Sequence, residues 1–217
     1  MALEFATQYT GRKVSFWPFT LIVLLPTTVF VGYAMGGWAS FSTILWVFGI
    51  IPILDLILGI DKNNPSPEDE KALVDSRPFR WITWLCAPTQ VFVAGFGLWA
   101  ITYADLTTLE SIGLLFSVGV CGGAMGINVA HELVHRDVKF ERRLGNVMLW
   151  TVCYMHWGIE HVYGHHAYVA TMKDPATAAR GDSIYQHLPK SLKRTVVNAW
   201  EIEKSRLAKV GKPFLSP

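Results

Sequence analysis

Near its start the chain has one long stretch without a charged residue, VSFWPFTLIVLLPTTVFVGYAMGGWASFSTILWVFGIIPIL (residues 14–54). The stretch has 41 residues. That is about twice the roughly 20 residues that one helix needs to cross the hydrocarbon layer of a membrane. Gly36 and Gly37 lie near its middle, where a turn forms most easily. The stretch therefore predicts two membrane helices joined as a hairpin.

Two further blocks, residues 81–104 and 111–130, also lack charges, and each has the length of one span. Hydrophobic residues make up 51% of the 217 residues, charged residues 17%, and the mean hydropathy is +0.30, which excludes an ordinary soluble domain. We therefore expect an all-α integral membrane bundle with four transmembrane helices, over 14–35, 38–60, 81–104 and 110–131. The first apolar stretch is too long for a signal peptide, so we expect the N-terminus to be retained.

The positive charges are distributed on one side of these helices only. All 19 Lys and Arg residues lie before the first span, between the second and third, or after the fourth, and the turns at 34–39 and 103–110 hold none. Because Lys and Arg stay on the cytoplasmic side, both ends of the four-helix set should face the cytoplasm. This predicts a cytoplasmic N-terminus over 1–13, a transmembrane region over 14–131, and a cytoplasmic region with a basic tail over 132–217.

Several classes of protein are not indicated. Cys86, Cys121 and Cys153 are spread singly and form no C-x-x-C pair, so neither a disulfide framework nor a thiolate metal site is expected. A net charge of +2 does not suggest nucleic acid as a partner. The basic tail mixes its cations with Glu201 and Glu203, which is typical of a solvated helix near lipid headgroups.

The histidines are clustered. None occurs in the first 130 residues, and six then fall within residues 131–166, which a shared metal would explain. The first motif is His131-Glu132-Leu133-Val134-His135, whose i and i+4 spacing places both imidazoles on one face of a helix. Taken alone, this H-E-x-x-H motif also fits a zinc protease in which the glutamate is the general base.

The second motif is Glu160-His161-Val162-Tyr163-Gly164-His165-His166. Together the motifs offer five histidines, which are too many for one catalytic zinc and suit two metals engaged in iron and oxygen chemistry. His165 and His166 would point about 100° apart on a regular helix, as ligands of different ions would. Glu132 and Glu160 are expected to orient imidazoles rather than bind metal. Of the remaining polar candidates, His156 is expected to support the site or lie at the surface, and His187 to be solvated. Asp55, inside the second span near its cytoplasmic end, fits either a functional or a paired structural role.

Two apolar features remain. Residues 144–159 hold no charge, but a fifth span there would place the two motifs on opposite sides of the membrane, so we expect a re-entrant or interfacial helix. Small residues precede the first motif, and they fit either close helix packing or the wall of a substrate passage: Gly119, Gly122, Gly123 and Gly126.

These motifs carry a resemblance to a known family. HELVHR (131–136) resembles the first histidine box of the membrane-bound alkane 1-monooxygenases, and EHVYGHH (160–166) resembles their second. Two other stretches, DKNNP (61–65) and KDPA (173–176), resemble family segments, so the likeness covers essentially the whole chain from the first span. Fatty-acid desaturases have an H-x-x-H-H second box, whereas three residues separate His161 from His165 here, which favours the alkane branch.

The resemblance implies a function. Such enzymes hydroxylate the terminal methyl of medium-chain n-alkanes with O2, two non-haem irons and electrons from rubredoxin. The implied location is the bacterial inner membrane, with the active site facing the cytoplasm, and the implied iron ligands are His131, His135, His161, His165 and His166. Three alternatives stay open: a related fatty-acid desaturase or hydroxylase, a membrane zinc protease, and a non-catalytic transport or receptor-like protein. Family members also have six spans and a third histidine box, so we expect this sequence to be part of a longer protein.

Overall fold

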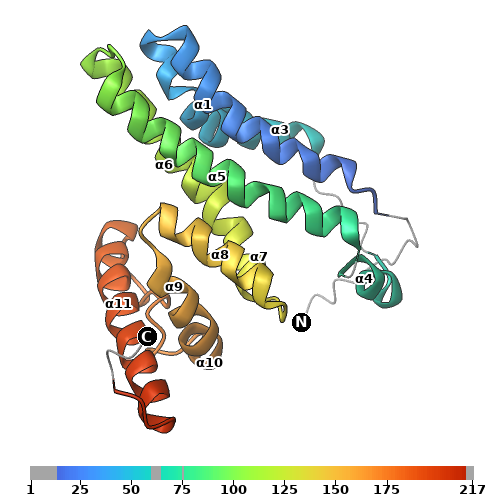
Figure 1. Cartoon of the computed structure of the whole chain (residues 1–217), viewed down its shortest axis with the longest axis vertical. Coiled ribbons are helices and arrows are strands. Elements are labelled where there is room, and N and C mark those ends of the chain that lie inside the picture. The colour runs from blue at the N-terminus through green and yellow to red at the C-terminus, as the bar shows by residue number, and fades with distance from the viewer. Residues whose placement is uncertain (1–13, 60–64, 75, 214–217) are drawn as a thin grey trace. The chain divides into compact units, whose positions relative to one another are not determined.

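The computed structural model describes residues 14–59, 65–74 and 76–213, and within those residues it contains helices and no strand (Figure 1). The chain forms two compact units, residues 1–129 and residues 130–217. The predicted cytoplasmic N-terminus over 1–13, and residues 61–64 of the DKNNP segment, lie outside the described residues.

The first unit begins with the predicted helical hairpin. Its first arm consists of the 3₁₀ helix η1 (Trp17–Val23) and α1 (Leu24–Met35). Its second arm consists of the 3₁₀ helix η2 (Gly37–Phe41), α2 (Ser42–Leu45), the π-helix η3 (Trp46–Ile50) and α3 (Ile51–Leu58). Gly36 and Gly37 form the turn with φ of +67° and +55°, a backbone region in which glycine carries no steric penalty.

The remaining elements of this unit are α4 (Pro67–Val74), α5 (Arg77–Tyr103), α6 (Thr108–Cys121) and the π-helix η4 (Gly122–Ile127), and α7 (Asn128–Val134) begins at its end. Four helices are long and apolar enough to cross a membrane: Trp17–Met35, Gly37–Leu58, Arg77–Tyr103 and Thr108–Val134. The predicted all-α fold with four membrane helices is therefore confirmed, with boundaries shifted by a few residues.

Close approaches between helices hold this unit together. A Cβ on Gly113 of α6 would lie 2.6 Å from the Cβ of Ser40 in η2, and the Ser117 hydroxyl donates a 2.6 Å hydrogen bond to the Ser40 carbonyl. Of the glycines that precede the first histidine motif, only some allow close packing between helices. Gly126 approaches the Gln90 side chain closely, whereas a Cβ on Gly119 or Gly123 would meet no atom within 4 Å.

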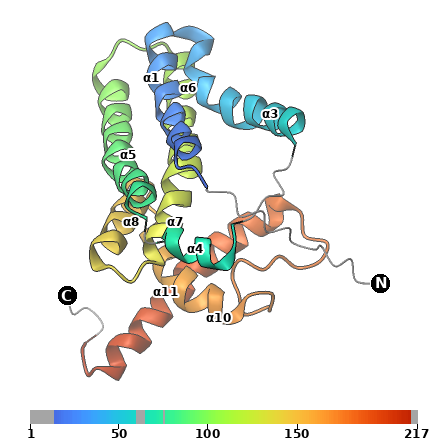
Figure 2. The ribbon, with the colours of Figure 1, turned by 90° about the vertical axis from the view of Figure 1, so that its right-hand side faces the viewer.

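The second unit contains the end of α7, then α8 (Lys139–Thr151), α9 (Met155–Glu160), the π-helix η5 (His161–His165), α10 (His166–Tyr168) and α11 (Ile184–Lys209). Ser183 and Gln186 form a capping box that begins α11. Helix α11 runs beside α9 and η5, which brings the chain that follows the second motif back against it (Figure 2). Buried Leu133, Met148, Leu149 and Ala199 form the core of this unit.

One expectation for this unit needs correction. The uncharged stretch 144–159 is not a single helix, because α8 ends at Thr151 and α9 begins at Met155. Cys153 adopts a φ of +55°, and the N–H of Tyr154 donates to the carbonyl of Leu149 at 2.8 Å, which closes a tight turn. The stretch is therefore a helical hairpin, and this conformation of a non-glycine residue could not be read from the sequence.

Candidate metal centre

The first motif lies at the end of α7. His131 is in the last turn of this helix and His135 is the first residue after it, so the i and i+4 spacing works as predicted. Their ring centroids lie 4.9 Å apart in an edge-on arrangement. Two imidazoles from one short segment therefore face the same space.

The second motif adopts a π-helical turn rather than the regular helix assumed from the sequence. In η5 the N–H of His166 donates to the carbonyl of His161, a bond between residues five apart. On an α-helix, residues five apart would point about 140° away from each other. The wider turn instead brings the Nε2 atoms of His161 and His166 to 3.2 Å. Gly164 lies inside this turn.

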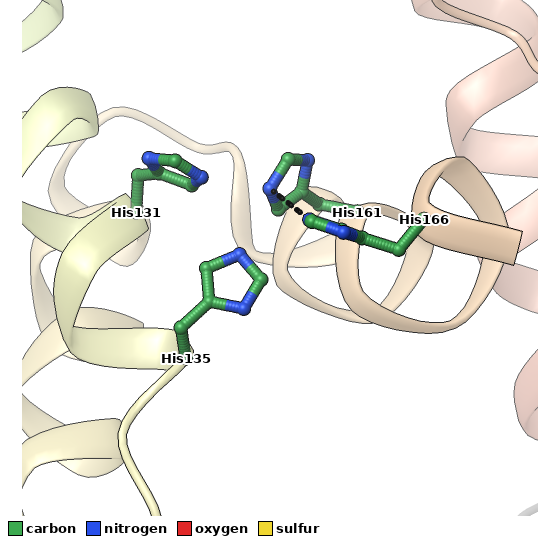
Figure 3. A group of neighbouring side chains, drawn as sticks. All are labelled: His131, His135, His161 and His166. Carbon is green, nitrogen blue, oxygen red and sulfur yellow. Dashed lines mark hydrogen bonds between the residues drawn. The ribbon is translucent and has the colours of Figure 1, made fainter. Parts of the chain in front are cut away.

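The two motifs converge. One nitrogen from each of His131, His135, His161 and His166 lies within 4.8 Å of the corresponding atoms of the other three. Figure 3 shows the two histidines of the first motif facing His161 and His166 of the second motif across a shared space. Two of the four rings are exposed and two are half-buried, so the site is accessible. Imidazole nitrogens without carboxylates fit iron, zinc, copper or nickel, and they do not suit magnesium or calcium.

The surroundings of His161 and His135 keep these two rings of the cluster neutral. Burial, together with the neighbouring imidazoles of His131, His166, His135 and His165, lowers the pKa of His161 to about 3. Burial and the neighbours His131 and His166 also lower the pKa of His135. Because a neutral imidazole presents a lone pair, these residues are ready to bind a metal at neutral pH.

His165 is placed differently from the other four histidines of the two motifs. It is not part of the converging group, although its ring stacks on His161 with centroids 5.2 Å apart. Its Nδ1 lies 3.0 Å from Oδ2 of Asp174, a carboxylate that is 1% exposed. Asp174 also accepts from the hydroxyl of Thr177 at 2.7 Å and from the N–H of Ala176 at 2.8 Å. Burial opposes ionisation of this group, but the hydrogen bonds outweigh it, and the pKa of Asp174 lies below its usual range.

Comparisons with known proteins show which family these two motifs resemble. The family described as "Fatty acid desaturase" matches residues 108–215. Alkane 1-monooxygenase 1 of Pseudomonas aeruginosa is 34% identical over 215 residues, which cover 96% of this chain and 56% of that protein. Alkane 1-monooxygenase of Pseudomonas putida is 32% identical over 220 residues, covering 99% and 54%. The chain belongs to the alkane hydroxylase family. It spans about half the length of the curated relatives it matches.

A more distant relative is named for different hydrocarbons, xylene and toluene. The hydroxylase component of xylene/toluene monooxygenase from Pseudomonas putida is 26% identical over 198 residues, which cover 88% of this chain and 50% of that protein.

The two glutamates beside the histidine boxes have different surroundings. The Glu132 side chain is 61% exposed, and its Oε1 lies 3.8 Å from Nδ1 of His131, too far for a hydrogen bond. Glu160 is 2% exposed and accepts a 3.1 Å hydrogen bond from Nδ2 of Asn198 on α11. Burial raises the pKa of Glu160 while the Asn198 contact opposes the shift. The hydrogen bond of Glu160 with Asn198 therefore joins the second histidine box to α11.

Other polar candidates lie outside the converging group. His156 contacts the ring of Tyr154, and its Nε2 is buried with no hydrogen-bond partner among the described residues. His187 lies in the first turn of α11. Asp55 is exposed in α3.

Sequence reasoning missed three residues at this site. Trp157, four residues before His161, stacks on that ring with centroids 4.2 Å apart and an interplanar angle of 15°. Asp174 belongs to the KDPA stretch that resembles a family segment, and nothing in the sequence marks Asn198. The spacing of Trp157 was a usable signal, because residues four apart on a helix are neighbours.

The close approach at Gly164 leads to a prediction. A Cβ on Gly164 would lie 2.6 Å from both Nδ2 of Asn198 and Oε1 of Glu160. We expect Gly164→Ala to destabilise the protein by about 1–3 kcal/mol, the usual cost of overpacking, because buried Glu160 and half-buried Asn198 must both move. The measurement is thermal unfolding in detergent. Gly123→Ala is the control, because its Cβ would meet no atom within 4 Å. Equal unfolding temperatures for the two variants would contradict the packing described here.

Proposed function

We propose that the protein containing this chain is a membrane monooxygenase that converts medium-chain n-alkanes to 1-alkanols with O2 and electrons from rubredoxin. The observation that carries this proposal is the convergence of His131, His135, His161 and His166, which come from both histidine boxes. Relatives named alkane 1-monooxygenase match over nearly the whole chain and support the substrate class.

In this proposal the four converging histidines hold iron, and His165 contributes from beside them. Five imidazoles are more than one catalytic ion needs, which supports a site for two irons. Iron supplies the one-electron chemistry with dioxygen that side chains lack. Of the two oxygen atoms, one enters the terminal C–H bond and the other leaves as water, which consumes two electrons and two protons.

The side chains around the cluster keep the ligands in a usable state. Asp174 accepts the Nδ1 proton of His165, which leaves the Nε2 lone pair available. Trp157 covers one face of His161 and fixes the plane of that ring. The neutral state of His161 and His135 avoids competition between protons and metal.

A membrane protein suits an alkane substrate for a simple reason. An alkane has no polar group and dissolves in the bilayer, so it can reach a catalytic site through apolar surroundings only. The helix Thr108–Val134, which carries His131, is itself apolar enough to cross the membrane.

The direct test is a product assay on the purified protein with rubredoxin, its reductase and NADH. We expect octane to yield 1-octanol. A fatty-acid desaturase or hydroxylase is the second candidate, because the fatty acid desaturase family matches residues 108–215. An acyl substrate converted in place of octane would favour that second function, and peptide cleavage with bound zinc would favour a protease.

We further propose that the site faces the cytoplasm of a bacterial inner membrane, as the distribution of Lys and Arg indicates. Cysteines introduced at exposed Asp137 and Ala167, in a Cys153→Ala background, should resist a membrane-impermeant thiol reagent in intact cells. Asp105→Cys, between the third and fourth helices, should react in the same cells. Labelling at 137 or 167 before permeabilisation would reject the orientation.

A further inference from the structure

We propose that the hairpin formed by α8 and α9 dips into the bilayer, so that its turn at 152–154 lies in the membrane edge at which the helix Thr108–Val134 ends. This inference does not depend on the chemistry at the histidines. It rests on the packing register of α8, on the placement of its charges, and on the hydrogen bonding of the turn.

The register of α8 places its middle at the membrane edge. A Cβ on Gly145 would lie 3.1 Å from the carbonyl oxygen of Ala130, 3.1 Å from Cβ of Leu133 and 3.0 Å from Cγ1 of Val134. The uncharged block 111–130 has 20 residues, and at about 1.5 Å per residue it spans the roughly 30 Å of hydrocarbon. Gly145 is therefore level with the end of the hydrocarbon layer.

The direction of α8 follows from the loop before it. Only residues 135–138 separate the end of α7 from the start of α8, so α8 begins beyond the end of the membrane helix. It reaches the level of Ala130 to Val134 only at Gly145, six residues into its length. The helix therefore runs back alongside α7, as the course of the two helices in Figure 1 also shows, and we infer that it points toward the membrane. Trp150, five residues later, lies about 7 Å deeper along the axis.

The charged residues of α8 all lie on one side of Gly145. Its ionisable residues all precede Gly145: Lys139, Glu141, Arg142 and Arg143. From Leu144 to Ile159 there is no Asp, Glu, Lys or Arg, although His156 lies in this stretch. Beyond Gly145, Asn146 is exposed, and the large exposed side chains that follow it are apolar, with Val147 41%, Trp150 63% and Met155 51% exposed. Tryptophan is enriched at the membrane interface, where its apolar ring and polar N–H are both satisfied.

The turn itself is suited to a low-polarity environment. The N–H groups of Val152, Cys153 and Tyr154 donate to the carbonyls of Leu149, Trp150 and Leu149, at 3.3, 3.0 and 2.8 Å. Unpaired backbone donors are costly in hydrocarbon, and this turn has none. The exposed apolar side chains of Val147, Trp150 and Met155 lie beyond the level at which the hydrocarbon layer ends, so the occupant we assign to this surface is lipid. On the return, a Cβ on Gly158 of α9 would lie 3.8 Å from Cγ1 of Val134, which places the second histidine box near the membrane edge.

The test compares two nitroxide labels on one face of α8 in lipid nanodiscs. Trp150→Cys and Arg143→Cys lie seven residues, or about 10 Å, apart along the helix. Both positions are exposed, and both variants carry Cys153→Ala, while Cys86 and Cys121 are buried. Power saturation measures collisions with O2, which concentrates in lipid, and with a water-soluble nickel chelate.

We expect the label at 150 to collide mainly with O2 and the label at 143 mainly with nickel, so that the ratio of the two rates inverts between them. The native Cys153, labelled in the unsubstituted chain, should behave like position 150. Nickel access at both positions would place the hairpin in water and overturn the proposal. Low access of both reagents to position 150 would show that protein covers this surface, and would equally overturn it.

Discussion

Replacing His131 by alanine should remove bound iron and lower octane hydroxylation by more than about 100-fold, while the helical content stays unchanged. The expected loss exceeds the 10–100-fold effect of residues that only support metal ligands, because an imidazole of the converging group is itself removed. The measurements are iron content, 1-octanol formation and circular dichroism on the same preparation.

His187→Ala is the matched control for this substitution. His187 lies in the first turn of α11 and does not belong to the converging group. The control variant should keep its iron and its activity. If both variants lost activity to the same extent, or if His131→Ala kept its iron, the assignment of His131 as a ligand would be wrong.

The Asp174→Asn variant should bind iron about 10–100-fold more weakly, the range typical of groups that orient metal ligands. Oδ2 of Asp174 accepts from both His165 and Thr177, and Oδ1 accepts from the N–H of Ala176. An amide has one oxygen only. If that oxygen keeps the Ala176 contact, its NH2 group faces the Nδ1 of His165 and favours the tautomer that carries its proton on Nε2.

Two readouts distinguish this effect from a loss of structure. Iron affinity, from competition with a chelator, should fall, and the thermal unfolding of the metal-free protein should change much less than the affinity. Asp182→Asn is the control, because the Asp182 carboxylate pairs with the exposed Lys190, at 3.3 Å, away from the converging histidines. Unchanged iron affinity in Asp174→Asn would contradict the role given to this carboxylate.

The sequence predicted those parts of the molecule that depend on local pattern. The four membrane helices followed from uncharged blocks, because crossing hydrocarbon requires a fixed length of apolar chain. The meeting of His131 with His135 followed from helical spacing.

The rest depends on features that no short window of sequence contains. The π-turn of η5, which turns His166 toward His161, breaks the helical period on which the orientation of His165 and His166 was estimated. The contacts of His165 with Asp174, and of Glu160 with Asn198, form only when the following loop and α11 fold back. The turn at Cys153 requires a backbone conformation that cysteine rarely adopts, so the break in the stretch 144–159 was not predicted.

The metal content of the protein purified in lipid nanodiscs is the direct test of whether the two histidine boxes together hold two irons. Elemental analysis gives the metal and its stoichiometry, and X-ray absorption at its edge shows whether imidazole nitrogens surround it. We expect two irons per chain in imidazole-rich coordination, both of them lost in His161→Ala. A single zinc with no iron, or iron retained in full by His161→Ala, would contradict it.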